Sequence, residues 1–200
     1  MKEKQELMTG KEINGLLTRW LSVLFYAEIA TLVMLAVAMI PALDGISGWI
    51  GRIVQAAVLV ALYQLSLVHE RYTKAFLYFA IAFVGSLFQV YAGSNPLTTI
   101  ASICGLVATY QEYHAHSEIL SMKDTYLADK WVSLFFWEMA VGILGSVATI
   151  AAVMFGANAG MEEGLLVILG VAIVGVLELP LSLLRLRYLK KMIGYYSREE

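Results

Sequence analysis

Long apolar blocks are the feature of this sequence that most constrains its fold. An apolar run of about 18 or more residues is long enough to cross the roughly 30 Å hydrocarbon core of a bilayer. Six blocks, each with at most one charged residue, follow one another along the chain: Leu21–Pro41, Ile53–Val68, Ala75–Ala92, Leu97–Gln111, Val132–Phe155 and Gly164–Leu184. The second block becomes long enough when it is extended back to Trp49. We therefore predict an all-α polytopic membrane protein with six transmembrane helices.

The rest of the sequence leaves no room for a soluble domain. The chain is 60% hydrophobic and 15% charged, whereas soluble domains are about 45–50% apolar and about 25% charged. Residues 1–15 are polar, so no cleavable signal peptide is predicted and the first span should remain as an anchor. We expect a cytoplasmic segment at residues 1–18, a six-span membrane domain at 19–187 and a cytoplasmic tail at 188–200.

The positions of the basic residues predict the orientation of the spans. Of the 14 Lys and Arg residues, all except Arg52 fall in the termini or in the loops on the same side as the termini. Because Lys and Arg are retained on the cytoplasmic side during insertion, both termini should be cytoplasmic. The expected outer loops are Ala42–Gly48, Gly93–Pro96 and Gly156–Glu163, and the expected inner loops are Glu70–Lys74 and His114–Lys130. Asp124 or Thr125 is expected to cap the start of the fifth span.

Matching segments suggest that the six spans form three helical hairpins. The stretch that begins at Arg19-Trp20 resembles the one at Lys130-Trp131, and a glutamate follows each of them. Two further matches keep a common spacing. Tyr63-Gln64 and His69 match Tyr110-Gln111 and His116, and Gln64 and Arg71 match Glu178 and Arg185. The alternative is that membrane helices resemble one another because they share a small set of residue types and interfacial aromatic side chains.

Ionisable side chains inside the spans are the strongest functional signal. Each costs about 2.5–3.5 kcal/mol to insert and normally faces the protein interior or a water-filled cavity. Glu28, Glu138 and Glu178 should each lie about 10–12 Å from the cytoplasmic interface, at 1.5 Å per residue. We expect a cytosol-facing polar pocket for ligand binding or proton coupling, lined by Glu28, Gln64, Gln111, Glu138, Glu178, Arg71 and Arg185. The alternative is that each carboxyl group is protonated or paired and only holds helices together.

The segment QEYHAHSE, residues 111–118, is a weak candidate for a metal site or proton relay. On a helix, Glu112 would share a face with His116, and His114 with Glu118. Weak candidate metal ligands are His69, Glu112, His114, His116 and Glu118. The spacing of a zinc-protease helix is missing, so the favoured interpretation is a solvated helix end. In that interpretation Tyr110, Tyr113 and Tyr126 lie in the interfacial aromatic belt.

These features favour a transport or permeation protein that binds a cation, a proton or a small polar solute. The alternatives are a non-catalytic membrane scaffold or regulatory subunit and an intramembrane metal-dependent enzyme. No sequence signal identifies a cofactor, and nucleic acid is not expected as a partner. The expected partners are the lipid bilayer and the solute or cation, with a second copy or another membrane protein as further options. We expect an integral protein of a bacterial cytoplasmic membrane. Pro180 should kink the last span.

Overall fold

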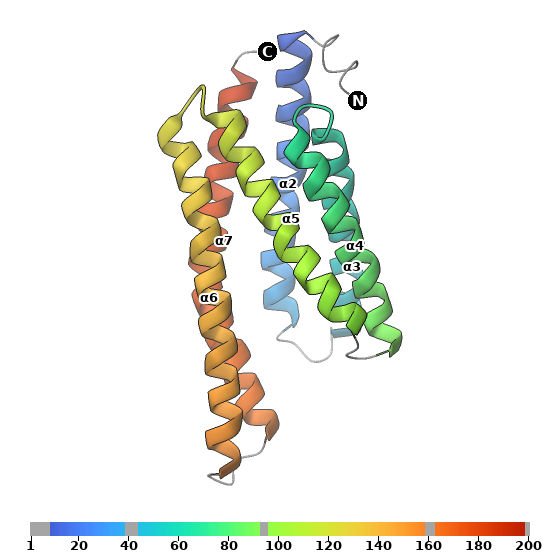
Figure 1. Ribbon diagram of the computed structural model, residues 1–200, viewed down its shortest axis with the longest axis vertical. Coiled ribbons are helices and arrows are strands. Elements are labelled where there is room, and N and C mark those ends of the chain that lie inside the picture. Colours follow the sequence, from blue (N-terminus) through green and yellow to red (C-terminus); the bar gives the residue numbers. More distant parts are fainter. Residues whose placement is uncertain (1–8, 39–43, 93–95, 159–162, 199–200) are drawn as a thin grey trace. The chain divides into compact units, whose positions relative to one another are not determined.

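The protein is all-α, as the apolar blocks predict. A computed structural model describes residues 9–38, 44–92, 96–158 and 163–198 (Figure 1). The helices in these ranges are α2 (Gly10–Ala38), α3 (Asp44–Leu65), α4 (Glu70–Ala92), α5 (Pro96–Leu120), α6 (Thr125–Asn158) and α7 (Glu163–Ser197). Residues 42–43, 93–95 and 159–162, which belong to the three expected outer loops, lie outside the described residues. The described parts of these loops are helical, because α3 begins at Asp44, α5 at Pro96 and α7 at Glu163 and because α6 ends at Asn158, so the predicted extents are wrong.

The chain divides into two compact units. Unit 1 comprises residues 1–132 and 186–200, and therefore contains α2 to α5, the start of α6 and the end of α7. Unit 2 comprises residues 133–185, which are the remaining parts of α6 and α7. In unit 1, α2 packs against α3, α3 against α4, and α4 against α5.

The two predicted inner loops are wrong in extent, because the helices continue through most of them. α4 already begins at Glu70, and α5 continues past His114 as far as Leu120. The turn between α5 and α6 is therefore short, and it is closed by backbone hydrogen bonds from Lys123 and Asp124 to the carbonyl of Leu120, both at 2.8 Å. The two segments are predicted to be loops because their residues are polar. The ends of membrane helices at an interface are polar as well, so polarity does not distinguish the two.

Side-chain caps explain where the helices begin. At α2, the backbone N–H and hydroxyl of Thr9 donate to Glu12, and the N–H of Glu12 donates back to the Thr9 hydroxyl, which is a capping box. At α6, Asp124 accepts a hydrogen bond from the N–H of Leu127 at 2.9 Å, which confirms the predicted cap. At α4, Nδ1 of His69 accepts from the N–H of Arg71 at 3.3 Å.

Helices α4 and α5 approach closely because small residues line their contact. A Cβ atom added at Gly85 would lie 2.3 Å from Cβ of Ala101, a distance that packed carbon atoms do not tolerate. At Gly105 on α5, an added Cβ would lie at an ordinary 3.8 Å from Ala82. Gly85 is therefore a position where α4 and α5 can approach closely because it carries no side chain.

Large apolar side chains point outward from the helices. On α4 they form a stripe at helical spacing, with Leu77, Ile81, Val84 and Phe88 each 49–54% exposed. Such an outer surface suits lipid rather than water. Among the described residues, the stretches long and apolar enough to cross a membrane are Gly10–Met34, Gly48–Leu65 and Thr125–Val147. These stretches support a membrane location. α7 continues through Pro180, and the kink there stays a prediction.

Candidate functional site

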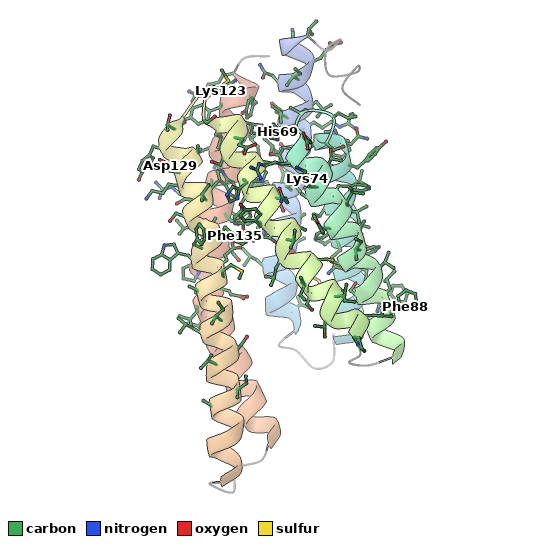
Figure 2. The ribbon with its side chains drawn as sticks, in the orientation of Figure 1. His69, Lys74, Phe88, Lys123, Asp129 and Phe135 are labelled. Atoms are coloured by element: carbon green, nitrogen blue, oxygen red, sulfur yellow. The ribbon has the colours of Figure 1, made fainter. Side chains whose placement is uncertain are left out.

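One end of unit 1 gathers the polar residues of several helices. Figure 1 shows that α2 begins, α7 ends, and the α3–α4 and α5–α6 turns lie at this end, uppermost in the view. Figure 2 shows His69 and Lys123 there and Phe88 at the opposite end of α4. We call this the turn end of unit 1. It carries a buried cluster (Tyr72, Glu112, His116 and Trp131) and an outer cluster (His69, Arg71, Gln111 and Glu118).

The buried cluster joins α4 and α5 through the two ring nitrogens of His116. Glu112 and His116 are one turn apart on α5, which places Oε1 of Glu112 3.4 Å from Nε2 of His116. From α4, the hydroxyl of Tyr72 lies 2.6 Å from Nδ1 of the same ring. Glu112 is 4% exposed and both other residues are 0% exposed. A carboxylate, an imidazole and a phenol are thus in contact and shielded from water.

The direction of the hydrogen bond between Tyr72 and His116 depends on the tautomer of the imidazole ring. Desolvation raises the pKa of Tyr72 well above its usual range, and the charges of Glu112 and Tyr196 raise it further. The Tyr72 hydroxyl therefore keeps its proton, and it donates that proton to Nδ1 when Nδ1 is the unprotonated ring nitrogen. In that arrangement Nε2 carries the ring proton, because a neutral imidazole has one donor and one acceptor nitrogen. Nε2 lies 3.4 Å from Oε1 of Glu112, a contact that lacks hydrogen-bond geometry.

Aromatic rings enclose this cluster. Trp131, at the start of α6, is fully buried, and its ring centroid lies 4.4 Å from that of His116. Tyr113 and Tyr188 meet the same indole edge-on at 5.1 and 5.8 Å. The prediction of a solvated helix end is therefore wrong for this face of α5. Tyr113 is fully buried rather than part of an interfacial belt, whereas Tyr126 is exposed.

The outer cluster connects the α3–α4 turn to α5 at the surface. Glu118 accepts from Nε of Arg71 and lies 3.2 Å from Nε2 of His69. Nη1 of Arg71 also donates to Gln111 at 3.2 Å. Glu118 therefore pairs with His69 and Arg71, whereas helical spacing had suggested His114. Nδ1 of His114 lies 3.0 Å from the carbonyl oxygen of Tyr110.

The predicted pocket residues fall into different environments. In unit 1, Glu28 on α2 is buried, whereas Gln64, Arg71 and Gln111 are half-buried. Of these, Arg71 and Gln111 are brought together. In unit 2, Glu138 and Arg185 are half-buried and Glu178 is exposed. The convergence of the three glutamates stays a prediction.

The metal hypothesis finds no support in the geometry of the described ranges. Within residues 9–38, 44–92, 96–158 and 163–198, no three His, Cys, Asp or Glu side chains are grouped so that they could hold a metal ion. Glu118 is instead occupied by Arg71. We therefore assign neither cluster to a metal.

Sequence reasoning missed Tyr72 and Trp131 as parts of the site. Both lie on other helices than His116, so no local spacing could have connected them to it. The sequence indicates only that each of them is an aromatic residue in the first two turns of its helix. No family model, curated protein or solved structure matches this chain, so its function has to be argued from the site itself.

Proposed function

We propose that the chain is an integral membrane protein that moves or admits a proton, a cation or a small polar solute through polar groups within its helices. The observation that carries this proposal is the burial of Glu28 on α2, where it is the one charged residue between Leu21 and Ala38. Membrane helices rarely keep an ionisable residue unless it serves a pathway or binds a ligand. Gln64, Glu138 and Glu178 are further residues that we assign to such a pathway.

The proposed topology has six spans and cytoplasmic termini, with the turn end of unit 1 in the cytosol. In support of it, described basic residues of unit 1 gather on the segments that meet at that end: Lys11, Arg19, Arg71, Lys74, Lys123, Lys130, Arg187, Lys190, Lys191 and Arg198. Arg52 lies in the first half of α3, away from the turn end. Because basic residues stay on the side of synthesis, this distribution favours a cytosolic turn end. A bacterial cytoplasmic membrane stays a prediction, which is based on the compact chain and its short loops.

Cysteine labelling in whole cells tests the topology. In a Cys104→Ala background, Gly48→Cys and Ser121→Cys place single thiols at two exposed positions. A membrane-impermeant maleimide should label the first in intact cells and the second only after lysis. The reverse pattern would place the termini outside.

Flux measurements in vesicles test the function. The full-length protein is reconstituted, and three probes are followed: protons with an enclosed dye, rubidium ions, and glycerol by vesicle swelling. At least one probe should enter faster than in empty vesicles, and Glu28→Gln should slow it. Glu70→Gln is the matched control, because Glu70 is exposed and paired with Lys74 at 3.1 Å.

Two outcomes would overturn the transport proposal. One is that none of the three probes enters faster than in empty vesicles. The other is that flux is unchanged in Glu28→Gln, Glu138→Gln and Glu178→Gln alike. A stoichiometric protein partner recovered from native membranes, together with absent flux, would favour the scaffold alternative.

A further inference from the structure

The buried cluster of unit 1 has the composition of a proton-binding site. Histidine is the side chain whose unperturbed charge changes between about pH 5 and 8. Both nitrogens of the His116 ring lie near oxygen atoms. Nδ1 is hydrogen-bonded to the Tyr72 hydroxyl at 2.6 Å, and Nε2 lies 3.4 Å from a carboxylate oxygen of Glu112 without hydrogen-bond geometry. The ring can therefore hold one proton or two without losing either neighbour. We propose that His116 is a buried proton-binding site, and that uptake of a second ring proton changes the packing of α4, α5 and α6.

The two states differ in the direction of one hydrogen bond and in one charge. In the neutral state, Nε2 carries the ring proton and Nδ1 accepts from the Tyr72 hydroxyl. The incoming proton binds Nδ1, which then donates to the Tyr72 oxygen, while the phenol keeps its own proton and rotates the O–H bond away from the ring. No covalent bond other than the new N–H forms. The cationic ring lies beside the carboxylate of Glu112 and compensates its charge.

Groups from each packed element face this site. Glu112 comes from α5 itself, Tyr72 from α4 and the indole of Trp131 from α6. Tyr196 on α7 acts electrostatically on Tyr72, whose raised pKa keeps the phenol protonated throughout the range in which histidine titrates. His69, in the α3–α4 turn, meets the Tyr72 ring edge-on at 6.4 Å. Among these groups, Glu112 is the one that attracts the imidazolium, because an opposite charge within about 4–6 Å favours the charged form.

The position of the cluster explains how a proton can reach it. Tyr72 lies in the first turn of α4 and His116 in the last turns of α5. Helix ends open locally at a lower free energy than helix centres, so water reaches the ring without global unfolding. This inference rests on contacts within unit 1 and stands whether or not the chain moves a solute.

Fluorescence of Trp131 tests the proposal directly. In full-length protein in lipid nanodiscs, Trp20, Trp49 and Trp137 are replaced by Phe, so that Trp131 is the only tryptophan left of four. Lowering the pH from about 8 to 5 should quench its emission, because a charged imidazolium forms 4.4 Å from the indole. The transition should disappear in His116→Gln and persist in the matched control His114→Gln. In Glu112→Gln, proton binding should weaken about tenfold, which moves the midpoint down by about one pH unit.

A second measurement keeps the test decisive if His116→Gln fails to fold. The double variant His69→Gln/His114→Gln retains His116 as the last of the three histidines. Its ¹⁵N ring resonances should pass from the neutral to the cationic pattern between about pH 8 and 5. Ring resonances that stay neutral over this range in folded protein would overturn the proposal. So would a Trp131 transition that survives in a folded His116→Gln variant.

Discussion

His69 and His116 follow the same Tyr-Gln pair at the same spacing, yet they lie in opposite environments. α3 ends at Leu65, so His69 falls in the turn that follows, half-exposed and paired with Glu118. α5 continues to Leu120, so His116 stays helical and fully buried against Tyr72. The length of the helix after the pair therefore decides which histidine becomes a surface ion-pair partner and which becomes part of the core.

The two matching tryptophans show the same contrast. Trp20 is half-buried on α2 and lies beneath the guanidinium of Arg19, at 5.1 Å from its ring centroid. Trp131 is fully buried among His116, Tyr113 and Tyr188. Similar sequence segments thus acquire different roles, and substitutions at matched positions measure the difference.

The largest expected effect is at the tryptophans. Trp131→Ala removes a fully buried indole and should lower the free energy of unfolding by about 3–5 kcal/mol, whereas Trp20→Ala should cost distinctly less. Thermal or denaturant unfolding in detergent, followed by circular dichroism, measures both. Equal losses of unfolding free energy in the two variants would contradict the inference that Trp131 belongs to the core and Trp20 does not.

Alanine substitutions of the two histidines should differ by a smaller amount in the free energy of unfolding. His116→Ala leaves the buried hydroxyl of Tyr72 without its partner, which costs about 1–3 kcal/mol. His69→Ala removes a partly exposed ion pair, which is worth about 0–1 kcal/mol. The double variant His116→Leu/Tyr72→Phe should recover part of the loss, because both polar partners are then removed. A double variant no more stable than His116→Ala would argue against the hydrogen bond as the cause.

Both clusters include residues of α4 and α5, which pack closely against each other. Alanine substitutions at two glycines in this contact test how much closeness the packing requires. Gly85→Ala forces a Cβ to 2.3 Å from Ala101, and we expect a loss of about 1–3 kcal/mol from overpacking. Gly105→Ala on the facing helix meets an ordinary contact at 3.8 Å. It should be neutral or slightly stabilising, because alanine favours the helix. The same unfolding measurement decides between these outcomes.

The smallest effect should come from pH at the Asp124 cap. The Tyr195 hydroxyl at 2.6 Å and the Leu127 N–H hold the pKa of Asp124 below its usual value. A carboxyl whose pKa is lowered by folding stabilises the protein above its unfolded pKa, and this stabilisation is lost as the pH falls through the folded value. The stability difference between the wild type and Asp124→Asn should therefore be constant above about pH 4 and shrink below it.

Asp129→Asn is the control for this titration, because Asp129 is exposed on the same helix. Unfolding curves recorded between about pH 6 and 3 for the three proteins provide the comparison. A difference between the wild type and Asp124→Asn that stays unchanged to the lowest pH would contradict the assigned hydrogen bonds.

Part of the candidate site could be predicted from the sequence. The i,i+4 spacing placed Glu112 beside His116, because a helix brings residues one turn apart together. The same rule failed for His114 and Glu118, because Arg71 and His69 reach Glu118 from another part of the chain. Local spacing predicts which side chains are neighbours on one helix, but not which stronger partner a neighbouring helix supplies.

The sequence by itself determined that this chain is all-α with long apolar helices, and that Asp124 or Thr125 starts one of them. Those properties depend on hydrophobicity and on residues within a turn of each other. Only the tertiary structure decided that His116 is buried against Tyr72 and Trp131 while His69 is not. The physical reason is that burial depends on where each helix ends and on how closely Gly85 lets α4 approach α5, and both involve residues far apart in the chain.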